Sequence, residues 1–226
     1  MNLKLNPNPL VRFLGKRPAE FTKEDLIRYI EANDIEMVNF RYPGADGRLK
    51  TLNFIINDAE YLDNILTLGE RVDGSSLFPY IEAGASDLYV VPRYRTAFRN
   101  TFSKIPAIDI LCSYYTKEGT PLETAPENTL RRAHQALREV TGLNYHVMGE
   151  LEYYVVTPAD PLFPADDQRG YHESTPFNKG AELRTLAMKY IAEAGGEIKY
   201  GHSEVGNFTQ EGKYTSRTRS SSCPRI

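Results

Sequence analysis

Apolar and polar residues recur along the chain with two different periods, one typical of helices and one typical of strands. Apolar residues at helical spacing follow Thr22 and Asp58, and each of these is a good helix N-cap residue. Thr22 with Asp25 three residues later also matches a capping box. The pattern therefore predicts one helix over about residues 23–33 and a short second helix after Asp58.

Alternation with the period of a strand predicts a sheet around these helices. Two alternating segments flank residues 43–47, whose glycines allow the positive φ that a hairpin loop needs. Further strands are predicted over residues 87–91 and 107–115. Helices and strands in this order indicate a small helix-on-sheet domain. We place it at residues 22–118, after an N-terminal lead over residues 1–21.

A second set of elements follows a linker. The composition turns to Gly, Pro, Thr and Glu near residues 117–126, which is typical of a connecting segment. Beyond it the pattern predicts helices over residues 127–140 and 179–194 and strands over residues 145–156 and 197–205. We expect these elements to form a partial second domain over residues 119–213, and residues 214–226 to be an aberrant tail.

Composition and charge exclude several classes of function. Of the 226 residues, 41% are hydrophobic and 25% charged, as in a folded chain, and the net charge of −3 gives no general case for nucleic-acid binding. Cys112 and Cys223 suggest no disulfide framework and fit a reducing compartment, so we expect a cytoplasmic protein. Pro7 and Pro9 interrupt any signal-peptide core, and no apolar run reaches about 18 residues, so no membrane span is expected.

The run from Gly149 to Val156 carries two candidate metal ligands. Side chains two residues apart on a strand share a face, so Glu150 and Glu152 project together. Paired carboxylates can bind hard divalent cations such as Mg²⁺ or Mn²⁺. The alternative is a solvated strand edge with alternating acids, and spacing alone leaves both interpretations open.

Two other runs are candidates for chemistry. His202 and Glu204 lie at a predicted strand end, where Glu204 offers a third carboxylate; a surface glutamate beside a hydrogen-bonded histidine is the alternative. Asp73 begins an Asp-Gly-Ser-Ser run that is also typical of a plain turn. The chain has no Walker A, no GxGxxG and no nucleophile-elbow sequence.

The order of these motifs resembles the glutamine synthetase family over about residues 22–212. Any one motif is weak, and their common order is the stronger signal. The matching runs are Asp73 to Ser76, Ser86-Asp87, Val90 to Pro92, Pro126 to Ala133, Glu150 to Glu152, Gly170-Tyr171 and His202 to Val205.

The resemblance implies an α+β fold, with a small β-grasp domain before the first part of a catalytic α/β domain that has an antiparallel sheet. It implies that Glu152 and Glu204 hold a metal that activates the substrate carboxylate. Glu150 would hold a second metal at the ATP phosphates. Asp73 would reach into the neighbouring subunit's site and help to bind ammonium, so the implied assembly is a homo-oligomeric ring.

The implied reaction joins ammonia to glutamate with ATP and with Mg²⁺ or Mn²⁺. The γ-carboxylate of glutamate attacks the terminal phosphate, and ammonia displaces the resulting acyl phosphate, while divalent metals screen the anions. Tyr153-Tyr154 stands in place of the family's Phe-Phe, and His202-Ser203 in place of its His-His. These departures indicate a divergent branch, for which another amine is an alternative substrate.

The last residues depart further from the family. A segment like Glu-Gln-Asn-Glu, whose last Glu is a metal ligand, is expected where Thr215 begins a Ser- and Arg-rich run. With suitable synonymous codons, a frame shifted by one base reads Tyr-Glu-Gln-Asn-Glu-Ile-Glu-Phe-Leu-Pro there. We therefore expect a frameshift, an inactive fragment, and a last strand without partners; a disordered basic tail is the alternative.

Two further functions stay open at the level of sequence. One is a non-catalytic β-grasp interaction module that binds subunits of an intact relative. The other is a small metal-binding protein that uses Glu150, Glu152 and Glu204.

Overall fold

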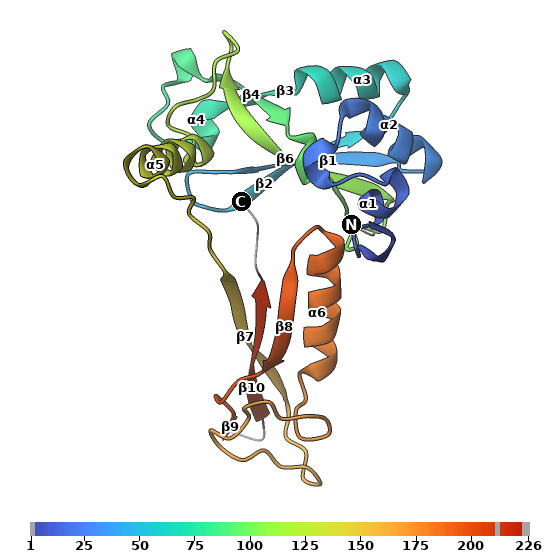
Figure 1. Cartoon of the computed structure of the whole chain (residues 1–226), viewed down its shortest axis with the longest axis vertical. Coiled ribbons are helices and arrows are strands. Elements are labelled where there is room, and N and C mark those ends of the chain that lie inside the picture. Colours follow the sequence, from blue (N-terminus) through green and yellow to red (C-terminus); the bar gives the residue numbers. More distant parts are fainter. Residues whose placement is uncertain (1–2, 211–212, 223–226) are drawn as a thin grey trace. The chain divides into compact units, whose positions relative to one another are not determined.

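The computed structural model describes residues 3–210 and 213–222 of the chain (Figure 1). The chain divides into two compact units, Met1–Tyr145 and His146–Ile226. The domain limits that we place after residues 118 and 213 stay predictions. Within the described residues, no helix has the length and apolar content needed to cross a bilayer.

Unit 1 combines helices with a mixed sheet. Its helices are α1 (Pro9–Leu14), α2 (Lys23–Ala32), α3 (Ala59–Leu68), α4 (Gly74–Leu77) and α5 (Pro126–Thr141), with 3-10 turns at Leu3–Leu5, Pro18–Glu20, Ala83–Ala85 and Tyr94–Thr96. Its strands are β1 (Met37–Pro43), β2 (Leu49–Ile55), β3 (Glu70–Asp73), β4 (Asp87–Pro92), β5 (Phe98–Arg99) and β6 (Ala107–Thr116). The helices and strands predicted for this part of the chain are confirmed.

The N-termini of α2 and α3 form for the reasons that the sequence indicates. The Thr22 hydroxyl accepts a hydrogen bond from the Asp25 amide, and the Asp25 carboxylate accepts one from the Thr22 amide, which completes the capping box. Asp58 caps α3 by accepting from the Tyr61 amide at 2.7 Å. These bonds satisfy backbone donors that the first helical turn leaves without partners.

The sheet of unit 1 has the strand order β2-β1-β6-β4-β3, and β5 pairs with β6. β1 and β6 are parallel and the other pairs antiparallel, so this sheet is mostly antiparallel. The predicted α+β class is confirmed. α3 packs against β4 and against α2. The core between helices and sheet includes Phe40, Val90 and Ile110, all with 0% exposure.

Residues 9–14 differ from the expected lead, because they form α1 and reach the core. Leu10 and Val11 have 0% exposure. Asn8 caps α1 through its side chain, Pro9 occupies the first turn and Gly15 ends the helix at φ 64°. Proline at this position begins a helix rather than breaking one, because the missing N–H has no helical partner there anyway.

Unit 2 is built on a second, antiparallel sheet. Its elements are β7 (Gly149–Pro158), α6 (Ala181–Glu193), β8 (Ile198–Ser203), β9 (Phe208–Gln210) and β10 (Lys213–Ser222). The strand order is β7-β10-β8, with β9 paired to β10, and α6 packs on β8 and β10 (Figure 1). The predicted strands and the long helix are confirmed with bounds shifted by a few residues.

The Ser- and Arg-rich segment is the middle strand of this sheet, which differs from our expectation of a tail. β10 pairs with β7 from Lys213↔Pro158 to Ser222↔Gly149, and with β8 on its other side. β8 therefore has a partner on one side, where we expected a strand without partners, and its other side remains an edge of the sheet in the described part of the chain. Strand pairing uses backbone groups, so a segment poor in apolar residues can still take this place. Residues 223–226 of the predicted tail lie outside the described residues.

Candidate functional site

Asp73 stands where β3 ends and α4 begins, and its carboxylate is held by its own loop. Its Oδ1 accepts from the Ser75 amide at 3.0 Å and from the Ser75 hydroxyl at 2.7 Å, and its Oδ2 accepts from the Ser76 hydroxyl at 2.6 Å. The bonds from Ser76 and Ser75 lower the pKa of Asp73 to about 2. The side chain is exposed and ionised at neutral pH, so it is suited to attract a cation.

Gly74 makes this turn possible. Its amide donates to the Ser86 carbonyl at 2.7 Å, and a Cβ at this position would lie 2.9 Å from both the Leu88 side chain and that carbonyl oxygen. A larger residue would therefore push the loop away from β4. The Asp-Gly-Ser-Ser order thus has a structural reason at each of its first two positions.

Glu150 and Glu152 lie on β7 and, by strand alternation, on one face of the second sheet. Glu150 is exposed and Glu152 half-buried. Glu204 follows the end of β8, and its Oε1 lies 3.7 Å from Nδ1 of His202. These residues lie in unit 2 and Asp73 lies in unit 1.

The register of the sheet relates β7, which carries Glu150 and Glu152, through β10 to β8, which ends just before Glu204. Arg219 pairs with Glu152 on one side and with His202 on the other, so these positions form one row across the sheet. Neighbouring strands are about 4.8 Å apart, which leaves β7 and β8 roughly 10 Å apart with β10 between them. A metal ion coordinated by side chains of both β7 and β8 therefore needs a further ligand from β10, the strand between them.

The residues present do not complete a metal centre. Within residues 3–210 and 213–222, no group of three His, Cys, Asp or Glu side chains is placed to hold an ion. The middle position of the row is an arginine, and a guanidinium has no lone pair to offer a metal. The Mg²⁺ or Mn²⁺ that the family resemblance implies therefore does not fit the described ligand set as it stands.

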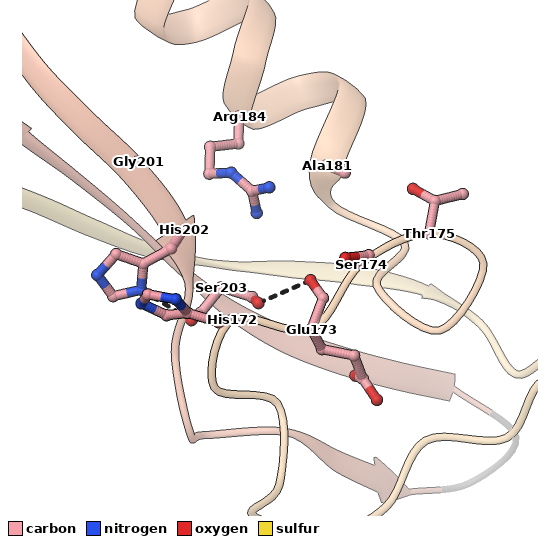
Figure 2. Close-up of a pocket in the computed structure, with 9 residues that line it drawn as sticks. All are labelled: His172, Glu173, Ser174, Thr175, Ala181, Arg184, Gly201, His202 and Ser203. Carbon is pink, nitrogen blue, oxygen red and sulfur yellow. Dashed lines mark hydrogen bonds between the residues drawn. The ribbon is translucent and has the colours of Figure 1, made fainter.

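Sequence reasoning missed a pocket on the same unit. Its wall includes His172, Ser174, Arg184 and Ser203, which come from a loop, α6 and β8 (Figure 2). Of the residues in this wall, the sequence motifs included only His202 and Ser203. Arg184 lies in an ordinary helical pattern, so periodicity gives no signal that it faces a cavity.

The Gly170-Tyr171 pair has a packing role beside this pocket. A Cβ on Gly170 would lie 2.1–2.3 Å from the side chain of Asn207, which is fully buried. Tyr171 stacks on His172 with ring centroids 4.2 Å apart and meets His202 edge-on at 5.3 Å. The glycine therefore permits the close approach that brings these rings together.

The fold of unit 1, with its parallel β1–β6 pair between antiparallel strands, defines a β-grasp type of domain. Residues 34–117 match the family described as "Glutamine synthetase, beta-Grasp domain". Similar curated proteins include the glutamine synthetases of Methanococcus maripaludis, 25% identical over 198 residues, and Clostridium saccharobutylicum, 26% identical over 200 residues. These matches cover 83% and 85% of this chain and 44% of each relative.

Solved structures agree with these matches on the fold. The match to the structure of Plasmodium falciparum glutamine synthetase covers 89% of this chain and 44% of that protein's chain, with a TM-score of 0.67 and 16% identity. The match to the structure of a protein named GmaS, without ligand, covers 86% of this chain and 45% of that protein's chain, with a TM-score of 0.60 and 10% identity. The chain is thus related to the glutamine synthetase family, and it spans less than half the length of these relatives.

Proposed function

We propose that the chain is part of a glutamine synthetase-type ligase, whose reaction joins ammonia to the γ-carboxylate of glutamate through an acyl phosphate. The relatives named glutamine synthetase support the class of enzyme. ATP, glutamate and ammonium as substrates, Mg²⁺ or Mn²⁺ as cofactor, a homo-oligomeric ring and a cytoplasmic location belong to this proposal. No nucleic acid takes part in it.

The observation that carries the proposal is the row across the second sheet. Glu152 and His202 flank position 219, and Glu204 follows His202 by two residues. With the synonymous codons that give this segment, one base added after the codon of Tyr214 would place the last Glu of Glu-Gln-Asn-Glu at position 219. The frame hypothesis therefore places its last Glu at the position that pairs with Glu152 and His202 in the strand register.

In this proposal Asp73 binds a cation but does not act as a general base. A carboxylate whose pKa is about 2 stays charged and holds a cation such as ammonium. The same low pKa makes it a weak base, because proton acceptance near neutral pH needs a pKa closer to that pH. We therefore assign Asp73 to ammonium binding and not to removal of its proton.

The chain as it stands is proposed to make no glutamine. β10 carries no His, Cys, Asp or Glu, and within the described residues no three such side chains are placed to hold an ion, so the metal centre that the reaction needs is incomplete. The test is ATP- and ammonium-dependent glutamine formation by the purified chain, with an intact glutamine synthetase as positive control. Glutamine formation above the background without ATP would overturn this proposal, and replacing ammonium by methylamine tests the other-amine alternative.

A non-catalytic interaction module is the second candidate, and one observation favours it. The buried hydrophobic cluster lies within residues 10–125, so unit 1 has a core of its own. A folded β-grasp unit of this kind can act by binding alone. Size-exclusion chromatography of the chain with an intact glutamine synthetase tests this role, and elution at two unchanged volumes would remove it.

A further inference from the structure

A cavity of about 470 Å³ lies within unit 2, between the loop at residues 172–175, the first turns of α6 and the edge strand β8 (Figure 2). This volume is within the usual range for pockets that bind small molecules. The lining residues are His172, Glu173, Ser174, Thr175, Ala181, Arg184, Gly201, His202 and Ser203.

The loop wall of this cavity is tied to the sheet. The His172 amide donates to the Ser203 carbonyl at 3.0 Å, and the Ser203 hydroxyl donates to the Glu173 carbonyl at 3.0 Å. The rings of His172 and His202 lie 4.4 Å apart between centroids. Hydrogen bonds and ring contacts therefore hold the loop against β8, so the cavity has a formed wall.

The charged groups of the wall favour an anion. Arg184 is the one Lys or Arg among the residues that line the cavity, and Figure 2 shows its guanidinium extending from α6 toward it. The Glu173 carboxylate points away from Arg184 in the same view, and its Oε2 accepts from Asn207 Nδ2 at 3.4 Å. A planar guanidinium suits the paired oxygens of a carboxylate or phosphate.

The edge strand adds backbone groups to the cavity. The Ser203 carbonyl points out of the sheet to the loop, since it accepts from His172. Backbone groups two residues apart on a strand point the same way, so the Gly201 N–H and C=O also face outward, at the cavity. Gly201 has no side chain, which leaves room for a ligand to approach its backbone.

We propose that this cavity binds a small metabolite that carries an oxyanion, a carboxylate or a phosphate. The oxyanion pairs with the Arg184 guanidinium, and a polar group of the ligand bonds to the Gly201 backbone. The Ser174 and Thr175 hydroxyls supply further polar groups at the rim. The proposal is independent of the ligase reaction, so its failure leaves that function untouched.

Calorimetric titration of the full chain tests the proposal with two probes, inorganic phosphate and succinate, at one fixed ionic strength. Arg184→Met removes the charge and the paired donors at similar length, and Arg184→Lys keeps only the charge. We expect saturable binding of at least one probe, at least about tenfold weaker in Arg184→Met, with Arg184→Lys in between. The tighter of the two probes identifies the oxyanion.

Lys189→Met is the matched control, because Lys189 lies on the same helix, pairs with Glu193 at 2.8 Å and does not line the cavity. Its binding should stay within about twofold of the unaltered chain. Saturable binding of neither probe would overturn the proposal, and so would an equal loss in Arg184→Met and Lys189→Met. If circular dichroism shows that Arg184→Met is unfolded, the Arg184→Lys comparison decides.

Discussion

The two units of the chain are held together in different ways. Within residues 3–207, every hydrophobic side chain that the structure describes as buried lies in unit 1, between Leu10 and Ala125. The buried side chains of unit 2 in the same part of the chain are polar: Asn178, Ser203 and Asn207. Unit 1 is therefore stabilised by a hydrophobic core, whereas strand pairing and buried hydrogen-bonding groups are what residues 146–207 show in unit 2. Unit 2 carries three of the four predicted site residues.

The largest expected loss of stability comes from truncating an apolar side chain in unit 1, and the same kind of change in unit 2 should cost much less. Phe40→Ala removes a ring with 0% exposure from the core of unit 1 and should lower the free energy of unfolding by about 3–5 kcal/mol. Val156→Ala in β7, where the side chain is 60% exposed, should cost less than about 0.5 kcal/mol. Urea denaturation measures both, and equal losses would remove the contrast between the units.

A buried charge inside the sheet of unit 1 gives the next effect. Asp109 accepts from Arg41 Nε at 2.6 Å, Asn39 at 2.8 Å and Asn100 at 3.0 Å. Asp109→Ala leaves these donors without their acceptor and should cost about 3 kcal/mol, the lower end for a broken buried pair, because Arg41 is partly exposed.

The control for this change is Asp87→Ala, which breaks the exposed Arg71–Asp87 pair and should cost less than about 1 kcal/mol. Denaturation midpoints compare the two variants. An Asp109→Ala chain as stable as Asp87→Ala would show that the buried polar network adds nothing to unit 1.

Two glycines of unit 1 with the same φ of 72° test how closely its elements pack. A Cβ on Gly69 would lie 2.3 Å from the Val90 carbonyl oxygen, whereas a Cβ on Gly47 meets nothing within 4 Å. Gly69→Ala should therefore cost about 2 kcal/mol or more, and Gly47→Ala only the backbone term of about 1 kcal/mol. Thermal unfolding of both variants checks the order, and the reverse order would contradict this packing.

The smallest effect concerns the charge of Asp73. Its pKa of about 2 lies below the usual value near 4, so its hydrogen bonds add stability that is complete above that usual value and lost as the pH falls toward 2. Ser76→Ala removes the bond that lowers the pKa most and should raise it. A carbon-13 NMR titration of the Asp73 carboxyl measures this, and an unchanged pKa would refute the assigned cause.

Local signals in the sequence predict most elements of the fold. The capping box at Thr22 and Asp25 and the alternation through β1, β2 and β6 depend on neighbouring residues, so they can be recognised without the structure. α1 was missed because Pro7 and Pro9 suggest a break unless the cap at Asn8 is considered together with them. β10 was missed because its place in the sheet comes from pairing with β7 and β8, which no local pattern encodes.

The candidate site, like the fold, has features that the sequence predicts and features that only the structure shows. The shared face of Glu150 and Glu152 follows from strand alternation alone. Their relation to His202 needed the register of three strands, and the cavity beside Arg184 needed the positions of a loop, a helix and a strand. Long-range geometry of this kind is not contained in any spacing along the chain.

Calorimetry with Mn²⁺ tests most directly the claim that position 219 is the missing ligand of a glutamine synthetase-type site. We predict no saturable Mn²⁺ site at this row in the unaltered chain and one in Arg219→Glu, which Glu152→Gln in the same background removes. Circular dichroism confirms that each variant is folded. A folded Arg219→Glu chain that gains no Mn²⁺ binding would contradict this claim, and so would an unaltered chain that already binds Mn²⁺ through Glu152.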